Sequence, residues 1–311
     1  MKLAHLLNLR RYRRCRRIFR RPLAAHLRIA RAGEEPIDLE LIDGAVLQVP
    51  NVRRCRGMFD WVLRRSPNPL PVSSGSGAII FRHGDVRVSL RPDGSDYYIF
   101  KEIFLEDIYG IDRTAGPLGT VIDLGGNIGL FTLKAAFRAE RVICVEPVPA
   151  NLELAKLNAR LNGLEEKAVF RRNAVTGGSD EMARIFLSSE ACAHSIRRQH
   201  TDAWETVGCE DVPTISIPDL FERERVERCS LLKCDIEGAE FEAFRQTPRD
   251  VLGRIDRIAM EVHFTADGWD ADAFGGLDEK LKSAGFDVDC EPLRDEEGKQ
   301  KQVVLLSAMR A

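Results

Sequence analysis

Val121-Ile-Asp-Leu-Gly-Gly-Asn-Ile-Gly129 decides the fold of this chain, because it joins an apolar run to a glycine-rich turn. The apolar run ends in Asp123 and predicts a buried parallel strand. Three glycines follow that strand: Gly125, Gly126 and Gly129. Glycines here let the chain turn tightly and let a ligand approach the backbone. We therefore expect a helix over about residues 127–139 and a nucleotide or nucleoside site at the carboxyl end of the strand.

The glycine spacing separates several kinds of nucleotide site. A dinucleotide site requires Gly-x-Gly-x-x-Gly, but Asn127 stands where the middle glycine would be. No Lys-Ser or Lys-Thr follows, so the stretch is not a P-loop. The spacing is similar to motif I of the methyltransferases that depend on S-adenosylmethionine (SAM), which implies that Asp123, the glycines and Asn127 bind this cofactor. The alternative is a turn whose glycines serve packing alone.

Two more predicted strands end in polar side chains. Arg141-Val-Ile-Cys-Val145 is apolar and is followed by Glu146, 23 residues after Asp123. In doubly wound folds an acid at about this distance binds the ribose hydroxyls, since a carboxylate accepts two hydrogen bonds. The third strand is expected at residues 169–172, with Asn173 at its tip. That amide can reach an adenine edge or serve the local turn.

A second stretch, Leu231-Leu-Lys-Cys-Asp-Ile-Glu-Gly-Ala-Glu240, repeats this pattern. Its apolar start predicts a buried strand with Asp235 at the tip, and residues 236–240 are expected to start the next helix. Acids in a first helical turn often only compensate the helix dipole, and we interpret Glu240 in this way. Asp235 is different, because a strand tip in an open α/β sheet faces the ligand crevice.

Together these motifs resemble those of the FkbM family of methyltransferases. The resemblance covers about residues 85–290 and rests on four main stretches: residues 121–129, 145–147, 232–240 and 260–263. The Lys-x-Asp-x-Glu-Gly-x-Glu string is the most specific of them, and Gly126 stands where an alanine is common in the family. The resemblance implies SAM-dependent O-methylation of hydroxyl groups, mostly on sugars, other glycans and secondary metabolites.

Strand and helix patterns alternate from Thr120 onward, which favours an α/β fold with a mostly parallel sheet. The first five strands are predicted to end at Asp123, Glu146, Asn173, Asp235 and His263. A sixth lies near residues 286–290 and a seventh at 302–306, and their short connection makes the last strand antiparallel. The expected architecture is a seven-stranded, Rossmann-like class I methyltransferase fold.

Three domains are predicted: a basic extension at residues 1–33, a lead-in at 34–118 and the methyltransferase domain at 119–311. The lead-in should contain a linker at residues 66–77, a β-hairpin around His83-Gly84-Asp85 and a helix over residues 96–109 that covers the SAM site or packs on the sheet. We expect residues 176–213 to be an irregular polar insertion near the acceptor. It contains Ser195, His200 and Trp204.

Charge is distributed unevenly along the chain. Residues 1–33 contain ten Arg, one Lys and no acid, whereas the whole chain has a net charge of −2. Apolar residues recur there at three- or four-residue steps: Tyr12, Cys15, Phe19, Leu23, Leu27 and Ala30. This pattern predicts a basic amphipathic helix that lies on an anionic membrane surface, with a polyanion such as RNA, packing on the acidic domain or a disordered tail as alternatives. The eight cysteines form no Cys-x-x-Cys, and the N-terminus does not have the pattern of a signal peptide. We therefore expect a cytoplasmic protein. If the basic helix binds lipid, the protein is expected at the inner face of the membrane.

An alcohol is a poor nucleophile at neutral pH, so a general base is expected in the acceptor site. Asp235 and His263 compete for this role, and Asp235 can instead orient the acceptor hydroxyl or the amino group of SAM. Glu237 is a candidate for binding a second hydroxyl. We predict no metal ion, because the three acids of the second stretch need not converge and no His joins them at a useful spacing.

Two other functions remain open at this point. A methyltransferase for RNA or protein amines would carry Asp/Asn-Pro-Pro-Tyr/Phe after the fourth strand, whereas this chain has Cys-Asp-Ile-Glu-Gly, so nucleic acid is not the favoured partner. A SAM-binding, membrane-associated protein without turnover would not need Asp235, Glu237 and His263. The favoured partner is a small molecule or glycan that carries a hydroxyl group.

Overall fold

The residues predicted to form the site lie in the second of two units of the chain, residues 1–102 and 103–311. The computed structural model describes residues 12–13, 15–31, 35, 37–42, 46–49, 79–91, 95–188, 194–198, 205–264, 271–294 and 300–310. The predicted linker at 66–77, His200 and Trp204 lie outside these ranges. Among the helices that the structure describes, none has the length and apolar character needed to cross a membrane.

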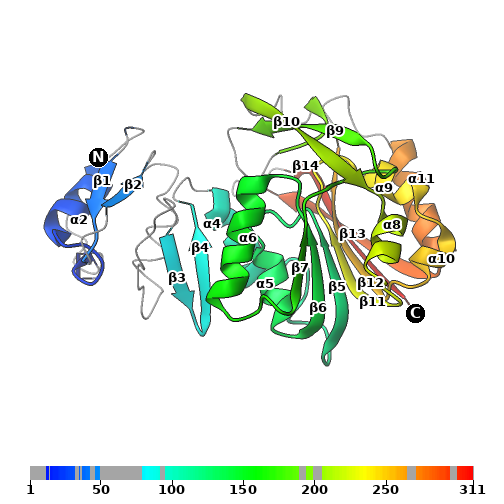
Figure 1. Ribbon diagram of the computed structural model, residues 1–311, viewed down its shortest axis with the longest axis horizontal. Coiled ribbons are helices and arrows are strands. Elements are labelled where there is room, and N and C mark those ends of the chain that lie inside the picture. The colour runs from blue at the N-terminus through cyan, green and yellow to red at the C-terminus, as the bar shows by residue number, and fades with distance from the viewer. Residues whose placement is uncertain are drawn as a thin grey trace. The chain divides into compact units, whose positions relative to one another are not determined.

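A seven-stranded sheet forms the centre of the second unit (Figure 1). Its strands, in spatial order, are β13 (Phe286–Arg294), β14 (Gln300–Arg310), β12 (Arg257–His263), β11 (Cys229–Cys234), β5 (Leu118–Leu124), β6 (Ala139–Val145) and β7 (Ala168–Arg171). Strands β12, β11, β5, β6 and β7 pair in parallel, and β14 is antiparallel to both of its neighbours. The predicted fold class is confirmed.

Helices cover both faces of this sheet, which explains why its strands read as continuous apolar runs. One face carries α5 (Leu130–Ala136) and α6 (Pro149–Leu161) (Figure 1). The other carries α8 (Ile217–Arg223), α9 (Glu240–Gln246), α10 (Arg249–Leu252) and α11 (Ala271–Ser283). Side chains of the central strands, such as Ile122 and Leu232, are 0% exposed.

The order of the strands reverses at β5, and this reversal positions the site. Strand β6 pairs on one side of β5, and β11, which is more than 100 residues later in the chain, pairs on the other. The register sets Lys233 beside Asp123 and Cys234 beside Leu124. In open α/β sheets ligands bind at the carboxyl ends of the strands where the order reverses. The two diagnostic stretches of the sequence therefore meet at one point.

Two helices begin later than the sequence suggested. The helix expected over residues 127–139 is α5, Leu130–Ala136, because Asn127 and Gly129 adopt left-handed φ angles of 46° and 75° that a helix cannot contain. Similarly, residues 236–239 form a turn, and α9 begins at Glu240. In that turn Glu237 has φ 55° and Gly238 has φ 99°.

The expectation of an irregular segment at residues 176–213 was wrong. It contains β9 (Met182–Ser188) and the start of β10 (Thr206–Ile215). These two strands pair antiparallel. Strand β10 also pairs in parallel with β8 (Ala174–Val175). Polar side chains hid this ribbon in the sequence, because they stand on its exposed face. Arg184 and Asp211, for example, are cross-strand partners whose side chains lie 3.0 Å apart.

The first unit contains α2 (Pro22–Arg31), β1 (Ile37–Glu40) paired with β2 (Val46–Val49), and β3 (Ile79–His83) paired with β4 (Val86–Leu90). The last pair is the predicted hairpin. The helix expected over 96–109 consists of α4 (Ser95–Phe100) and a π-helical segment (Lys101–Glu106) that ends before Asp107, whose φ is 51°.

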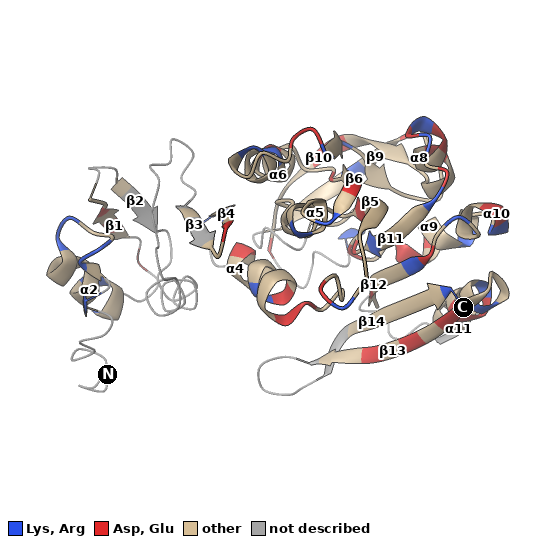
Figure 2. Ribbon diagram, turned by 90° about the horizontal axis from the view of Figure 1, so that it is seen from below, with Lys and Arg blue, Asp and Glu red and all other residues tan. Residues whose placement is uncertain are grey.

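The basic amphipathic helix is shorter than predicted in the part of the chain that the structure describes. Residues 16–18 form a turn, and α2 begins only at Pro22 (Figure 2). The basic residues of α2, Arg28 and Arg31, lie in its last turn. The predicted apolar face is also divided, because Phe19 is 3% exposed and bridges to Leu41 whereas Leu23 is 56% exposed. The side chains of Phe19 and Leu23 therefore do not form one continuous lipid-facing stripe.

Candidate cofactor and acceptor site

The glycine turn after β5 is packed so closely that side chains are excluded from it. A Cβ on Gly125 would lie 1.7 Å from the carbonyl oxygen of Asp235, and one on Gly129 would lie 2.7 Å from Cβ of Ala155. The amides of Gly125 and Gly126 both donate to the carbonyl of Val145, each at 3.0 Å. The turn is thus held against the ends of β6 and β11.

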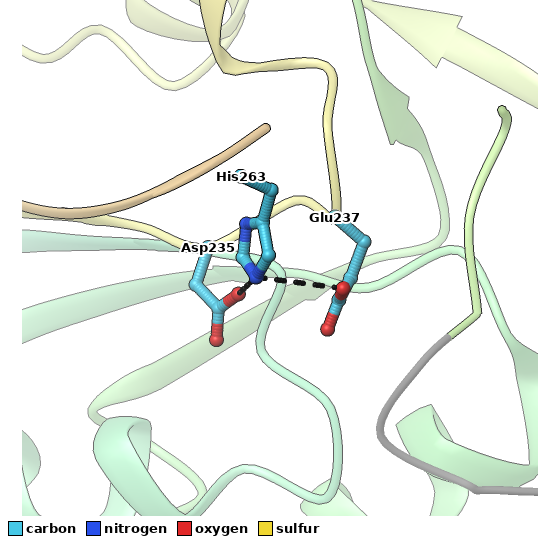
Figure 3. Close-up of side chains that lie close together, drawn as sticks. All are labelled: Asp235, Glu237 and His263. Atoms are coloured by element: carbon cyan, nitrogen blue, oxygen red, sulfur yellow. Dashed lines mark ion pairs between the residues drawn. The ribbon is translucent and has the colours of Figure 1, made fainter. Parts of the chain in front are cut away.

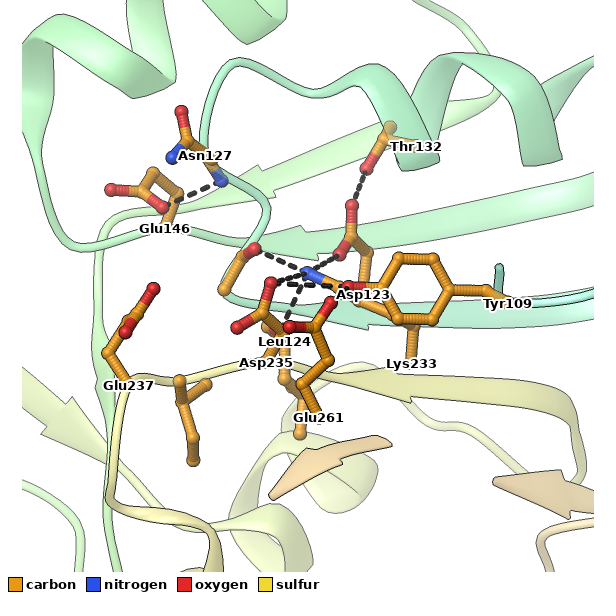
Figure 4. Close-up of polar contacts among 12 residues, drawn as sticks. Tyr109, Asp123, Leu124, Asn127, Thr132, Glu146, Lys233, Asp235, Glu237 and Glu261 are labelled. Atoms are coloured by element: carbon orange, nitrogen blue, oxygen red, sulfur yellow. Dashed lines mark hydrogen bonds and ion pairs between the residues drawn. The ribbon is translucent and has the colours of Figure 1, made fainter. Parts of the chain in front are cut away.

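Glu146 follows β6 and is buried against the glycine turn (Figure 4). One carboxylate oxygen accepts from the amide of Asn127 at 2.8 Å, and the other accepts from the amide of Val148 at 2.9 Å and from Asn151 at 3.3 Å. Burial raises the pKa of Glu146 to about 7, although these hydrogen bonds and the charge of Lys233 act in the opposite direction. The sequence placed this carboxylate beside the turn, and the structure does the same.

Lys233 is a central residue that sequence reasoning missed. Its ammonium group donates to the carbonyl of Gly125 at 2.6 Å and lies 3.3 Å from Asp123 and 3.5 Å from Asp235 (Figure 4). Burial alone would lower the pKa of Lys233, but the charges of Asp123, Asp235 and Glu261 raise it above its usual value. The lysine therefore ties the ends of β5 and β11 together as a cation. The second oxygen of Asp123 accepts from Thr132 at 2.6 Å.

Tyr109 and Glu261 complete this side of the site and were also missed. The Tyr109 hydroxyl lies 2.6 Å from Glu261 and 3.3 Å from Asp235. Its ring meets Phe131 edge to face, with centroids 5.4 Å apart. Glu261 belongs to the stretch 260–263 that the sequence analysis singled out. It stands two residues before His263 and therefore lies on the same face of β12. This alternation could have identified Glu261 as a site residue. Nothing local in the sequence marks Tyr109.

His263, at the end of β12, brings the predicted acids together (Figure 3). Its Nε2 lies 3.5 Å from Glu237 and 3.9 Å from Asp235, and its Nδ1 lies 3.1 Å from Glu240. Burial alone would lower the pKa of His263, but Glu237 and Glu240 raise it well above its usual value. The expectation that no His joins these acids was wrong, because the partner comes from a neighbouring strand rather than from the same turn.

Glu240 has a larger structural role than dipole compensation. Its side chain is fully buried, and it accepts hydrogen bonds from the amides of Ile236, at 3.1 Å, and Gly238, at 3.2 Å, in addition to its contact with His263. The carboxylate therefore fixes the turn that carries Glu237 and orients the imidazole ring at the same time.

Glu240→Ala is expected to lower the free energy of unfolding by about 1–3 kcal/mol, because it leaves buried amides without an acceptor. Glu242→Ala is the matched control, since Glu242 lies on the same helix and its side chain is 42% exposed. Urea unfolding of both variants measures the difference. Equal stabilities of the two variants would show that Glu240 does not hold the turn.

The β9–β10 insertion reaches this turn through Ser195. The Ser195 hydroxyl is buried and donates to the backbone carbonyl of Glu237 at 2.5 Å. Asn173, expected near an adenine edge, points its amide toward the carbonyls of Pro213 and Thr214 at 3.4 and 3.3 Å. The insertion thus contacts the acid-bearing turn, and Asn173 is engaged with the backbone of β10.

A family model and several known proteins match this chain. The FkbM methyltransferase domain matches residues 123–288, more than half of the chain. The chain is 27% identical over 225 residues to the AMB antimetabolite synthetase AmbE of Pseudomonas aeruginosa, covering 61% of this chain but only 10% of that protein. It is 26% identical over 186 residues to Methyltransferase 1 of Beauveria bassiana, covering 53% of this chain and 72% of that one. A SAM-dependent methyltransferase structure from Agrobacterium tumefaciens is similar with a TM-score of 0.44 and 14% identity, over 78% of this chain and 72% of that one.

The sheet order and the glycine turn, together with the domain match, define a SAM-dependent methyltransferase of class I. The chain belongs to the FkbM methyltransferase family. The family resemblance noted from the sequence is confirmed, and SAM is the cofactor.

Proposed function

We propose that the chain transfers the methyl group of SAM to a hydroxyl oxygen of a sugar, another glycan or a secondary metabolite. The observation that carries this proposal is the group of carboxylates around His263, at the ends of β11 and β12. Carboxylates accept hydrogen bonds from neighbouring hydroxyls, as a polyol acceptor requires. The turn after β11 carries Asp235 and Glu237 in place of the Pro-Pro-aromatic motif of amine-directed enzymes.

The residues of the glycine turn fit a nucleoside with a cationic side chain. In our proposal Glu146 accepts the ribose hydroxyls, while the backbone of Gly125, Gly126, Asn127 and Gly129 forms the surface against which the ligand lies. Asp123 supports this turn through Lys233, which also bonds to the carbonyl of Gly125, and Asn173 remains a candidate for the adenine edge. Bound SAM supplies an electrophilic methyl carbon.

The chain's own residues position the acceptor and accept its proton. Asp235 is the favoured proton acceptor, because its side chain is 25% exposed whereas that of His263 is 7% exposed. His263 faces three carboxylates, which favour the protonated ring, and a protonated ring cannot act as the base. We therefore assign His263 an orienting role and Glu237 the binding of a second acceptor hydroxyl.

The acceptor class is tested by incubating the protein with methyl-labelled SAM and a panel of glycosides and hydroxylated metabolites. Each is matched with its deoxy analogue and with its amino analogue. Label is expected in the hydroxyl compounds as an ether that resists mild base, and not in the deoxy analogues. Preferential labelling of the amino analogues would contradict O-methylation.

The basic extension at residues 1–33 is proposed to place the enzyme on the inner face of an anionic membrane. Support comes from the ten Arg and one Lys of this segment, which contains no acid. Arg20 and Arg21 lie 2.7 and 3.9 Å from Glu40, but their side chains are still 63% and 81% exposed. Each basic residue near such a surface contributes about 1 kcal/mol to binding.

A further inference from the structure

We infer that Asp235, Glu237 and His263 form a binding site for a divalent first-row transition metal ion, such as Mn²⁺ or Zn²⁺. One carboxylate oxygen of each acid and one ring nitrogen of His263 lie within 4.8 Å of one another (Figure 3). An imidazole nitrogen combined with carboxylate oxygens suits these ions better than Mg²⁺, which prefers oxygen ligands.

The spacing is close to what an ion requires. Two atoms that each bind one ion at about 2.1 Å are at most about 4.2 Å apart. The distances from Nε2 of His263 to Glu237 and Asp235 are 3.5 and 3.9 Å. The carboxylate oxygens of Asp235 and Glu237 lie within 4.8 Å of each other. A small movement of these side chains, which are 25% and 20% exposed, would bring the two oxygens to the distance that one ion requires.

The surroundings of His263 provide a second, independent argument. Its other ring nitrogen, Nδ1, lies 3.1 Å from Glu240. Glu240 is not one of the three proposed ligands, and its side chain is fully buried. Metal-binding histidines usually bond in this way to a carboxylate through the ring nitrogen that does not hold the metal, and this contact directs Nε2 toward the ion. The side chain of His263 is only 7% exposed, so the surrounding residues restrict the orientation of its ring.

This inference deepens the proposed function and, for the role of the ion, rests on it. The ion would bind the acceptor hydroxyl at a position that the three side chains leave open, and it would lower the pKa of that hydroxyl. With the ion bound, Asp235 and His263 would act as its ligands in place of the roles given above, and His263 would give up its ring proton. The hydroxyl proton would then pass to water, and the oxygen would form a bond to the methyl carbon as the bond from that carbon to sulfur breaks, which releases S-adenosylhomocysteine.

The ion is tested directly on the full chain, without any acceptor. Protein dialysed against EDTA is titrated with Mn²⁺ by calorimetry and with Co²⁺ by visible absorption. We expect one ion per chain, with binding weakened by more than about tenfold in Glu237→Gln and in His263→Ala. Glu242→Gln removes the same charge from a side chain of α9 that is 42% exposed, and this variant should bind the ion as the wild type does. Circular dichroism confirms that each variant is folded.

Absence of saturable binding at millimolar ion, or equal binding by the wild type and Glu237→Gln, would overturn the inference. Methyl transfer is then measured in the same preparations with and without EDTA. Hydroxyl methylation that persists in EDTA, without ion binding, rejects the metal site and leaves the proposed function intact. Ion binding at these residues without methylation of any hydroxyl compound rejects the proposed acceptor instead.

Discussion

Asp235→Asn is expected to lower kcat for methyl transfer by about 10²–10⁴-fold, the usual contribution of a positioned acid–base group. The amide keeps the size of the carboxylate but loses its charge and its ability to accept a proton. It also loses most of its affinity for a metal ion, so the expected effect is the same whether Asp235 acts as base or as ligand. The affinity for SAM should change by less than about tenfold, because Glu146 and the glycine turn remain.

The measurement is the steady-state rate of label transfer from SAM to a hydroxyl acceptor, together with calorimetric titration of SAM. Asp211→Asn is a suitable control, since its side chain is 55% exposed on β10 and pairs with Arg184. A kcat for Asp235→Asn within a factor of two of the control would remove Asp235 from the chemistry.

Glu146 is expected to make SAM affinity depend on pH. Its pKa is about 7, so the carboxylate is mostly charged at pH 8 and mostly protonated at pH 6. Only the charged form accepts hydrogen bonds from both ribose hydroxyls with both oxygens, so the Kd for SAM should rise by up to about tenfold as the pH falls from 8 to 6. The change follows from the raised pKa: a carboxylate with an ordinary pKa would stay charged over this whole range.

At pH 8, Glu146→Gln should bind SAM about tenfold or more weakly than the wild type does. The Kd of this variant should change little between pH 8 and pH 6. Glu153→Gln is the matched control, because Glu153 lies on α6 with its side chain 66% exposed. A pH dependence in Glu146→Gln equal to that of the wild type would assign the titration to another group.

The parts of the fold that follow from local sequence were predictable. Apolar runs that end in a single polar residue marked β5, β6, β11 and β12, since strands buried on both faces admit few polar side chains. The glycine turn was also clear, because a left-handed residue such as Gly125 beside a neighbouring strand excludes other side chains. Helix starts were less predictable, since positive φ at Asn127 and Glu237 delays them without an obvious local signal.

The parts of the site that depend on contacts distant in sequence were not predictable. His263 meets Glu240 across 23 residues, and Tyr109 meets Glu261 across 152. Lys233 looked like an ordinary strand residue, and only the pairing of β5 with β11 shows that it bridges Asp123 and Asp235. The β9–β10 ribbon was hidden for a related reason, because its exposed face is polar. The continuous apolar face predicted for the basic segment was not found, because tertiary packing buries Phe19 but exposes Leu23.

We propose that two groups of residues have separate roles: the glycine turn with Glu146 holds SAM, and Asp235, Glu237 and His263 bind and activate the acceptor. Calorimetric titration of SAM at pH 8 into wild type, Glu146→Ala and Asp235→Asn separates these roles. We expect the wild type and Asp235→Asn to bind with similar affinity, and Glu146→Ala to bind more than about tenfold more weakly. Loss of SAM binding in Asp235→Asn, with wild-type affinity in Glu146→Ala, would contradict it.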